Sequence, residues 1–386
     1  MKKNNDFILS KDFCDKIFDG THDSPKPCDI GKHKLVTSKN IINGKIDDKD
    51  AYYISDEDYE KIQKRSAVCG NDILFSMIGT IGNVCRLTET PDYAIKNMGV
   101  FRCENEKDSK WLYYYLQTDI AKKFIEKLMS GSIQKFIALD KLGYIPIMKR
   151  TETIDKVVDV IEEIDMQIER NNAMVQKLQV MSNTIYSKTF STCKDKISFY
   201  DYPYLELLKP GITQFDGKKT YIPTAEVNGN NINFNSSKIT FENRENRANM
   251  QPVYNSVWFA KMKNSNKHIY LTEKDNHLID NFIFSTGFCG VKCQDFAFEY
   301  IVGTVELPYF EEMKDKLAHG ATMESVNNDD LKSLLIPNPS KELLEQYHNQ
   351  TKNIYKQMSL IRIENHKLET LKNNLLPLLI NGQLEV

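Results

Sequence analysis

A long stretch without glycine or proline, Glu152–Phe190, is the feature that most constrains the fold of this chain. Apolar residues recur in it at alternating spacings of three and four, and only Asn171 and Ser182 interrupt the series. The apolar positions are Ile154, Val157, Ile161, Ile164, Ile168, Val175, Leu178 and Ile185. This heptad spacing predicts one continuous helix of roughly 50 to 55 Å with a narrow apolar face.

The last part of the chain repeats this spacing. Its positions are Tyr347, Thr351, Ile354, Met358, Ile361, Asn365, Leu368 and Leu375, with Leu379 following Pro377. An offset of 193 residues overlays Ile154 on Tyr347 and also brings Asn172 onto Asn365. Two helices with one narrow apolar face each are predicted to pack against each other. The alternative is two unrelated helices on separate cores.

The composition is that of a soluble globular protein. The chain has 386 residues, of which 41% are hydrophobic and 27% charged, and this allows two or three domains. No apolar run approaches the roughly 18 residues of a membrane span, and Met1–Ser10 lacks a signal-peptide core. We therefore expect a cytoplasmic protein without membrane contact. The eight cysteines contain no CxxC pair, which favours reduced thiols and no metal site.

Net charge neither supports nor excludes nucleic-acid binding. The whole chain carries −2. Residues 1–150 contain 25 basic and 22 acidic groups, whereas residues 191–338 contain 16 and 19. Any basic footprint for DNA must therefore be local or come from a partner.

The two regions before the long helices follow one plan of short β-rich runs and turns. The matched segments are Lys34–Thr37 with Tyr221–Thr224, Asn43-Gly44 with Asn228-Gly229, Ile73–Ser76 with Ser256–Lys261, and Ser130–Ser132 with His319–Ala321. The pattern predicts an α+β protein with two duplicated globular domains of mixed α and β structure. The predicted order is domain (1–150), helix (151–190), domain (191–338) and helix (339–386).

Several motifs carry a family resemblance. In the first half they are Gly70–Ser76, Gly79–Gly82, Ser130–Lys135 and Ile145–Ile147; in the second half they are Tyr221–Val227, Trp258–Met262, Ser285–Phe288 and Leu335–Pro339. Their order and duplication resemble the specificity subunit of a type I restriction–modification system. One departure is Met148-Lys149-Arg150, which replaces the second proline that the other half keeps as Pro339.

This resemblance implies a non-catalytic subunit. Its two target-recognition domains each read one half of a split sequence in double-stranded DNA, and an antiparallel coiled coil of the two helices fixes the gap between the halves. The implied partners are two modification (methyltransferase) subunits and restriction (motor-nuclease) subunits. The chain itself holds no cofactor, because AdoMet belongs to the modification subunit. A modification-only system without a restriction partner is an alternative.

Loop residues that hydrogen-bond to bases or phosphates are the candidates for DNA contact. In the first half they are Thr21, His22, Ser38, Lys39, Ser76, Thr80, Ser132, Gln134 and Lys135; in the second half they are Thr224, Lys261, Lys263, Ser285, Thr286, His319 and Thr322. Glu324 occupies the place of Lys135, which indicates that the halves read different bases. Asn172 and Asn365 are the candidates for fixing the register of the helix pair.

Catalytic functions find little support in the sequence. It contains no Gly-rich AdoMet loop of a methyltransferase and no GxxxxGK(S/T) phosphate loop. Pro91-Asp92 with Asp108-Ser109-Lys110 has the nominal spacing of a metal nuclease, but such short patterns arise often by chance. The remaining alternative is a coiled-coil scaffold that binds proteins. Strong salt dependence of DNA affinity would separate the two functions, because only phosphate contacts release counterions.

Overall fold

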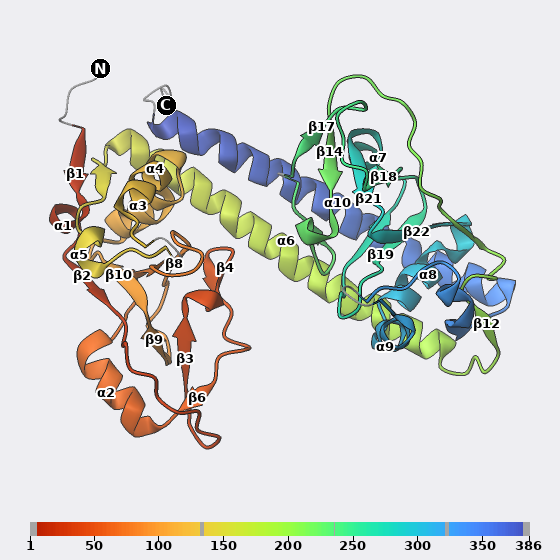
Figure 1. Cartoon of the computed structure of the whole chain (residues 1–386), viewed down its shortest axis with the longest axis horizontal. Coiled ribbons are helices and arrows are strands. Elements are labelled where there is room, and N and C mark those ends of the chain that lie inside the picture. Colours follow the sequence, from red (N-terminus) through yellow and green to blue (C-terminus); the bar gives the residue numbers. More distant parts are fainter. Residues whose placement is uncertain (1–5, 132–134, 235, 321–323, 381–386) are drawn as a thin grey trace. The chain divides into compact units, whose positions relative to one another are not determined.

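The computed structural model describes residues 6–131, 135–234, 236–320 and 324–380. The chain forms two compact units, one of Met1–Met166 with Thr370–Val386 (unit 1) and one of Gln167–Glu369 (unit 2). Each unit contains one strand-rich domain and a segment of each of two long helices (Figure 1). These helices are α6 (Glu152–Phe190) and α10 (Lys341–Ile380).

The first strand-rich domain belongs to unit 1 and contains two sheets. One is an antiparallel sheet of order β2-β10-β7-β8, and the other has the order β6-β3-β9 with β3 parallel to β9. A hairpin of β4 and β5 and a pair of β1 with β11 complete the domain. The strands are β1 (Phe7–Leu9), β2 (Lys16–Asp19), β3 (His33–Thr37), β4 (Ile41–Ile42), β5 (Lys45–Ile46), β6 (Tyr53–Ile54), β7 (Ile73–Ser76), β8 (Val84–Arg86), β9 (Tyr93–Lys96), β10 (Met98–Arg102) and β11 (Pro146–Met148).

Helices cover the four-stranded sheet and build the core of unit 1. Trp111 and Tyr115 of α3 are fully buried with Phe75 of β7, and Ile161 of α6 and Leu376 of α10 join the same cluster. The helices of this domain are α1 (Ser10–Phe13), α2 (Asp56–Ser66), α3 (Glu106–Leu116), α4 (Asp119–Leu128) and α5 (Leu139–Leu142), with the 3-10 turn η1 (Ser38–Asn40).

The segment from Glu106 to Leu128 forms two helices, α3 and α4, rather than one. The hydroxyl of Thr118 accepts a hydrogen bond from the amide of Ala121 (3.2 Å) and caps α4. This capping starts a new helix at Asp119. The break therefore has a local cause, a threonine between two apolar helical segments.

The second strand-rich domain belongs to unit 2 and repeats this plan. Its antiparallel sheet has the order β13-β22-β19-β20, and its mixed sheet has the order β17-β14-β21-β18 with β14 parallel to β21. A hairpin of β15 and β16 and a pair of β12 with β23 complete it. The strands are β12 (Lys196–Ser198), β13 (Leu205–Leu207), β14 (Lys219–Ile222), β15 (Val227–Asn228), β16 (Asn231–Ile232), β17 (Lys238–Ile239), β18 (Ala248–Met250), β19 (Ser256–Ala260), β20 (His268–Leu271), β21 (Phe282–Ser285), β22 (Phe288–Cys293) and β23 (Leu335–Pro337).

The core of unit 2 joins its sheet to both long helices. Phe259 of β19 and Tyr300 of α8 are fully buried in one cluster with Tyr186 and Phe190 of α6 and Tyr347 of α10. The other helices are α7 (Asn276–Asn281), α8 (Phe298–Val305) and α9 (Pro308–Leu317), with the 3-10 turns η2 (Thr224–Glu226), η3 (Asp295–Ala297) and η4 (Asp330–Ser333).

The matching strand orders confirm the duplication. In both domains the first strand pairs with the last, one sheet is antiparallel, and the other contains one parallel pair. The turn predicted at Asn43-Gly44 connects β4 to β5, and both residues have positive φ (51° and 77°). Such a turn matches the twist of the flanking strands. The α+β class with two duplicated strand-rich domains is thus observed.

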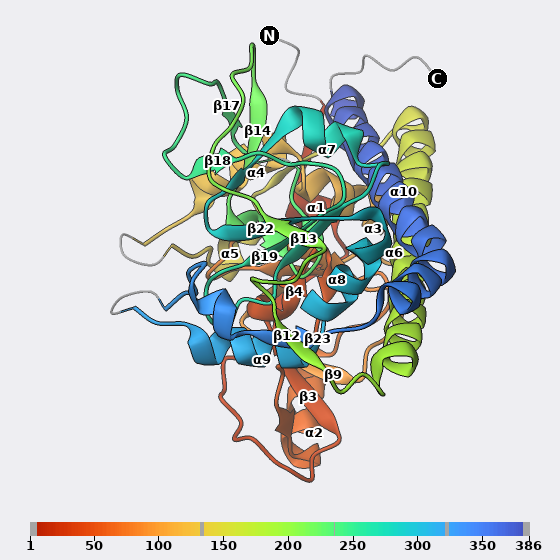
Figure 2. The same ribbon diagram turned by 90° about the vertical axis from the view of Figure 1, so that its right-hand side faces the viewer.

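The helix predicted over Glu152–Phe190 is α6, with the same bounds. Within unit 2, α6 and α10 lie side by side and run antiparallel (Figure 2). The rings of Phe190 and Tyr347 lie 4.9 Å apart, and Asn171 donates to Asn365 (2.8 Å). Asn365 in turn donates to Asn172 (3.0 Å). The buried asparagine is Asn171 rather than Asn172, so one amide of α10 bonds to two of α6. The supercoiling of the two helices stays a prediction, as does the role of Asn172 and Asn365 in fixing their register.

Two kinds of feature are absent from the described residues. No helix among them has both the length and the apolar character needed to cross a bilayer. They also contain no group of three or more His, Cys, Asp and Glu side chains placed to hold a metal ion.

Candidate nucleic-acid interface

The loops of the first strand-rich domain gather at one end of its two sheets. In the antiparallel sheet, Ser76 at the end of β7 pairs with Met98 at the start of β10, next to Asp19 at the end of β2. In the other sheet, Thr37 at the end of β3 pairs with Lys96 at the end of β9. Because only Asn97 separates β9 from β10, the ends of all these strands meet. We call this end of the domain, with its equivalent in the second domain, the loop end.

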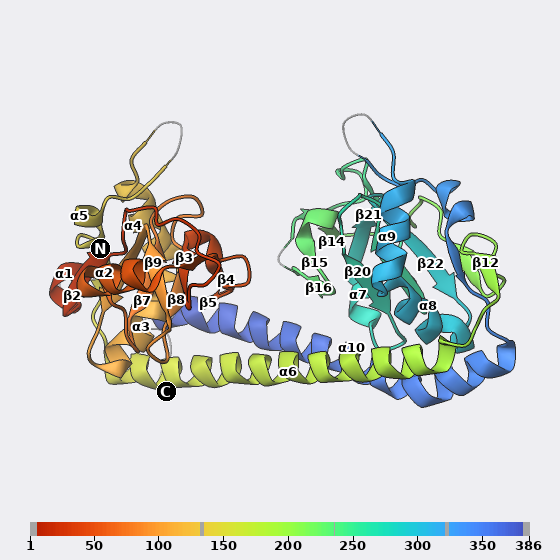
Figure 3. The ribbon, with the colours of Figure 1, turned by 90° about the horizontal axis from the view of Figure 1, so that it is seen from below.

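A hairpin that carries the predicted contact residue Lys135 leaves the domain at this end. Ser130 and Phe136 pair with each other, and Phe136 also pairs with Ile78 in the loop after β7. The hydroxyls of Ser76 and Ser38 both donate to the carbonyl of Ile78 (3.1 and 3.3 Å). Ser38 lies 40 residues before Ile78 in the sequence, so segments distant in the chain are joined at one carbonyl group. Figure 3 shows the hairpin arms leading away from the body of the domain.

The second strand-rich domain forms an equivalent loop end. Met262 pairs with Ser325 of the second hairpin, as Ile78 pairs with Phe136 in the first. The amide of Lys261 donates to Gly287 (3.0 Å), which joins the loop after β19 to the turn between β21 and β22. The ammonium of Lys267 donates to the carbonyl of Thr224 (2.8 Å), which adds η2. The predicted residues of this half therefore lie on neighbouring loops.

Three predicted contact residues are buried. Ser76 is fully buried, Ser285 is 2% exposed and Thr21 is 6% exposed. The hydroxyl of Ser285 accepts from the amide of Gly287 (3.1 Å), and that of Thr21 accepts from the amide of Asp23 (3.1 Å). These hydroxyls stabilise the loops and offer no free surface to a ligand.

The other described candidates reach the surface. The exposed ones are His22, Lys39, Thr80, Lys135 and His319, and the partly exposed ones are Ser38, Thr224, Lys261, Lys263 and Thr286. Ser132, Gln134 and Thr322 lie outside the described residues. The surface of each loop end thus includes lysine, histidine and hydroxyl side chains, which are donors suited to phosphates and base edges.

Each loop end also holds one histidine in a defined place. The ring of His22 lies between Asp19 (2.7 Å) and Asn97 (2.9 Å). The ring of His319 contacts Asp330 (3.4 Å) and the carbonyl of Leu317 (3.2 Å). None of the contacts described for these two rings is to a hydroxyl or thiol.

Two basic residues at the second loop end, Arg247 and Lys267, were not among the predicted contact residues. The carbonyl of Arg247 accepts from the amide of Thr286 (2.9 Å), so its exposed side chain lies beside a predicted residue. The second residue, Lys267, bonds through its ammonium to the carbonyl of Thr224. The polar run before β18, which contains Arg244 and Arg247, was the available signal for the first. No family motif of the second half includes Lys267.

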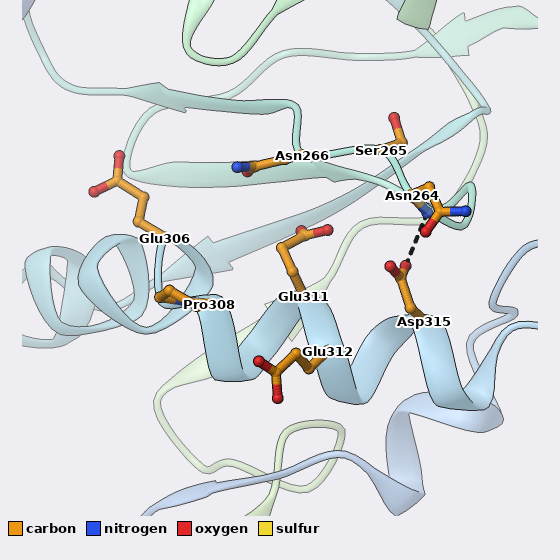
Figure 4. A pocket seen from close by; sticks show the side chains of 8 residues that line it. All are labelled: Asn264, Ser265, Asn266, Glu306, Pro308, Glu311, Glu312 and Asp315. Carbon is orange, nitrogen blue, oxygen red and sulfur yellow. Dashed lines mark hydrogen bonds between the residues drawn. The ribbon is translucent and has the colours of Figure 1, made fainter. Parts of the chain in front are cut away.

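One pocket of the second strand-rich domain has the wrong charge for DNA. It measures about 370 Å³ and lies between α9 and the turn after β19 (Figure 4). Its carboxylates are Glu306, Glu311, Glu312 and Asp315, which would repel phosphate. Burial alone would raise the pKa of Glu311, but hydrogen bonds from His268 and Lys314 hold it below its usual value. These contacts make Glu311 part of the packing of α9 on the sheet.

Known proteins resemble this chain in sequence and in fold. The family model of the type I restriction modification DNA specificity domain matches residues 5–173. This stretch belongs to the specificity-domain family. The family resemblance read from the motifs is therefore confirmed. The comparison with curated proteins found no match.

Solved structures extend the likeness in fold beyond the matched specificity domain. The type I restriction–modification S subunit from M. genitalium is 13% identical, with a TM-score of 0.54 over 98% of this chain and 97% of that one. The HsdS subunit from Thermoanaerobacter tengcongensis is 11% identical and gives 0.35, over 100% and 99%. At this identity, the first comparison establishes a shared fold that includes the second strand-rich domain.

Proposed function

We propose that this chain is the DNA-recognition subunit of a type I restriction–modification complex, with each loop end reading one half of a split target. The observation that carries the proposal is the recurrence of one loop end twice in a chain whose first half is a specificity domain. A single reader would need one such surface. Two copies that differ in their exposed side chains suit two different half-sites.

The chemistry of the loop ends supports a binding role rather than catalysis. Lys39 and Lys135 in the first domain and Arg247 in the second are exposed, and no described carboxylate pairs with them. Cations of this kind bind phosphates and fix a protein on the duplex. We therefore propose a non-catalytic subunit, with AdoMet and the methyl transfer supplied by modification subunits.

The long helices offer a surface for those partners. In unit 2, Met174, Val180 and Met181 of α6 are 50, 67 and 52% exposed. Exposed apolar side chains gathered on one helix mark an interaction surface. We propose that two modification subunits bind to the helices and domains and that restriction subunits join this complex. In the same proposal the helix pair sets the gap between the half-sites.

The test is co-expression of the chain with the methyltransferase subunit encoded beside it, followed by mapping of methylated adenines in the host DNA. We expect one motif of two short half-sites separated by a fixed unspecified gap. Exchange of residues 1–150 for the equivalent domain of a related protein should then change one half-site and leave the other unchanged.

Two outcomes would contradict the proposal. A stable complex without new methylation would favour a protein-binding scaffold. Failure to form any complex would argue against the subunit assignment itself. The salt dependence of DNA affinity provides an independent check, because phosphate contacts lose affinity steeply as salt rises.

A further inference from the structure

The two hairpins of the loop ends differ in charge at one equivalent position. The first hairpin carries Lys135 followed by Phe136, and the second carries Glu324 followed by Ser325. A carboxylate on a surface that faces phosphates is repelled by them. A glutamate at this place therefore needs a specific reason.

Glu324 is bonded to Lys263 at two points. Its side chain accepts a hydrogen bond from the ammonium of Lys263 (2.8 Å), and its carbonyl accepts from the amide of the same lysine (3.0 Å). The neighbouring pair of Met262 with Ser325 extends this contact as a short antiparallel ladder. The carboxylate thus has a fixed direction, set by backbone and side chain together.

The carboxylate nevertheless remains open to solvent. The Glu324 side chain is 47% exposed and the Lys263 side chain 35% exposed. One lysine occupies one oxygen, and a carboxylate has about four acceptor positions on its two oxygens. Free acceptor capacity therefore stays directed outward, while the lysine reduces the repulsion from nearby phosphates.

From these contacts we propose that Glu324, oriented by Lys263, accepts a hydrogen bond from an exocyclic amino group in the major groove of the half-site that the second domain reads. This inference rests on the proposed function. Only cytosine N4 and adenine N6 present such donors there, and a carboxylate accepts from either. Lys135 gives the first domain a donor instead, which selects acceptors such as guanine N7 and O6.

The experiment uses the chain in complex with its methyltransferase subunit. Glu324→Ala, Glu324→Gln and Lys263→Met are compared with the unchanged chain by methylated-adenine mapping and by methylation of duplexes that carry each base pair at every half-site position. The matched control is Glu345→Gln, since Glu345 also belongs to an exposed lysine pair (Lys341, 3.7 Å) but lies on α10.

We expect Glu324→Ala to relax the preference at one position of one half-site by about 5- to 150-fold, with the other half-site unchanged. Lys263→Met should relax the same position less. Glu324→Gln separates the two bases: it should retain the preference if that base is adenine, which glutamine binds bidentately, and should move it towards adenine if the base is cytosine.

Three results would overturn the inference while leaving the proposed function intact. They are an unchanged motif in Glu324→Ala, an equal loss at all positions, and an effect matched by Glu345→Gln. Absence of any split motif with the unchanged chain would instead contradict the proposed function. Recovery of the complex by gel filtration separates a folding defect from altered recognition.

Discussion

His366 of α10 is a titratable residue in an aromatic cluster of unit 2. Its ring lies 4.1 Å from that of Phe234 and 5.5 Å from that of His277. Burial lowers the pKa of His366 below its usual value, and the nearby charges of His277 and Lys238 lower it further. The folded chain therefore favours the neutral imidazole.

This depressed pKa predicts a loss of stability in acid. The unfolded chain takes up the proton near pH 6.5, whereas the folded chain resists it. The contribution of His366 is thus present above pH 6.5 and is lost as the pH falls through the folded-state pKa. We expect His366→Phe, which keeps the ring contact with Phe234, to lose less stability than the unchanged chain between pH 7 and pH 5. Urea unfolding at several pH values measures this, and parallel pH curves would contradict it.

At the same scale, residue type predicted the candidate site only in part. Serine and threonine at strand ends were predicted to contact DNA, yet Ser76, Ser285 and Thr21 are buried and bond to their own loops. A hydroxyl can bond either to DNA or to its own loop. Whether it is buried depends on which strands pair. Arg247 was missed for the same reason, because its place beside Thr286 arises from strand pairing.

At the scale of elements, a buried ion pair helps to join α10 to the second strand-rich domain. Arg362 contacts Asp275 (2.6 Å) and the carbonyl of Tyr270 (2.9 Å), and Asp275 is fully buried. The second oxygen of Asp275 accepts from the amide and hydroxyl of Thr272. A charge held in this way cannot regain water when its partner is removed.

We therefore expect Arg362→Gln to lower the free energy of unfolding by about 3–5 kcal/mol. The matched control is Lys356→Gln on the same helix, because Lys356 pairs with Glu273 (2.9 Å) at the surface. Exposed pairs contribute up to about 1 kcal/mol. Urea unfolding followed by fluorescence compares the two variants. Equal losses would show that the Arg362 pair is no stronger than a surface contact.

Elements differ in how far the sequence determines them. The bounds of α6 follow from local signals, a sustained heptad and the absence of glycine and proline. The strand orders were not predictable, because each strand of four or five residues has several partners of similar pattern. Parallel pairing of β3 with β9, for example, requires α2 and two strands of the other sheet to come between them in the chain.

At the scale of the whole molecule, the proposed role of the helices as a spacer can be tested by lengthening them. One heptad inserted after Asn172 and another before Asn365 adds about 10 Å to both helices. This corresponds to about three base pairs of duplex, which also rotate the far half-site by about 100°. We expect the same half-sites, a longer gap and slower methylation, measured by methylated-adenine mapping.

A heptad inserted in α6 alone provides the control. It shifts α6 against α10 by one repeat and separates Asn171 from Asn365, so complex formation should fall. An unchanged gap after the double insertion would contradict the spacer role, because the half-sites would then be positioned by the partner subunits.

The packing of Leu376 has a consequence for how the protein is made. Leu376 of α10 is buried against Ile154 and Ile161 of α6, so the core of unit 1 contains residues from both ends of the chain. A ribosome releases the whole of unit 2 before it releases Leu376. Until then the core of unit 1 lacks its contribution from α10, and the apolar surface that Leu376 covers faces water or a chaperone. The half of the protein that is synthesised first is therefore the half that is completed last.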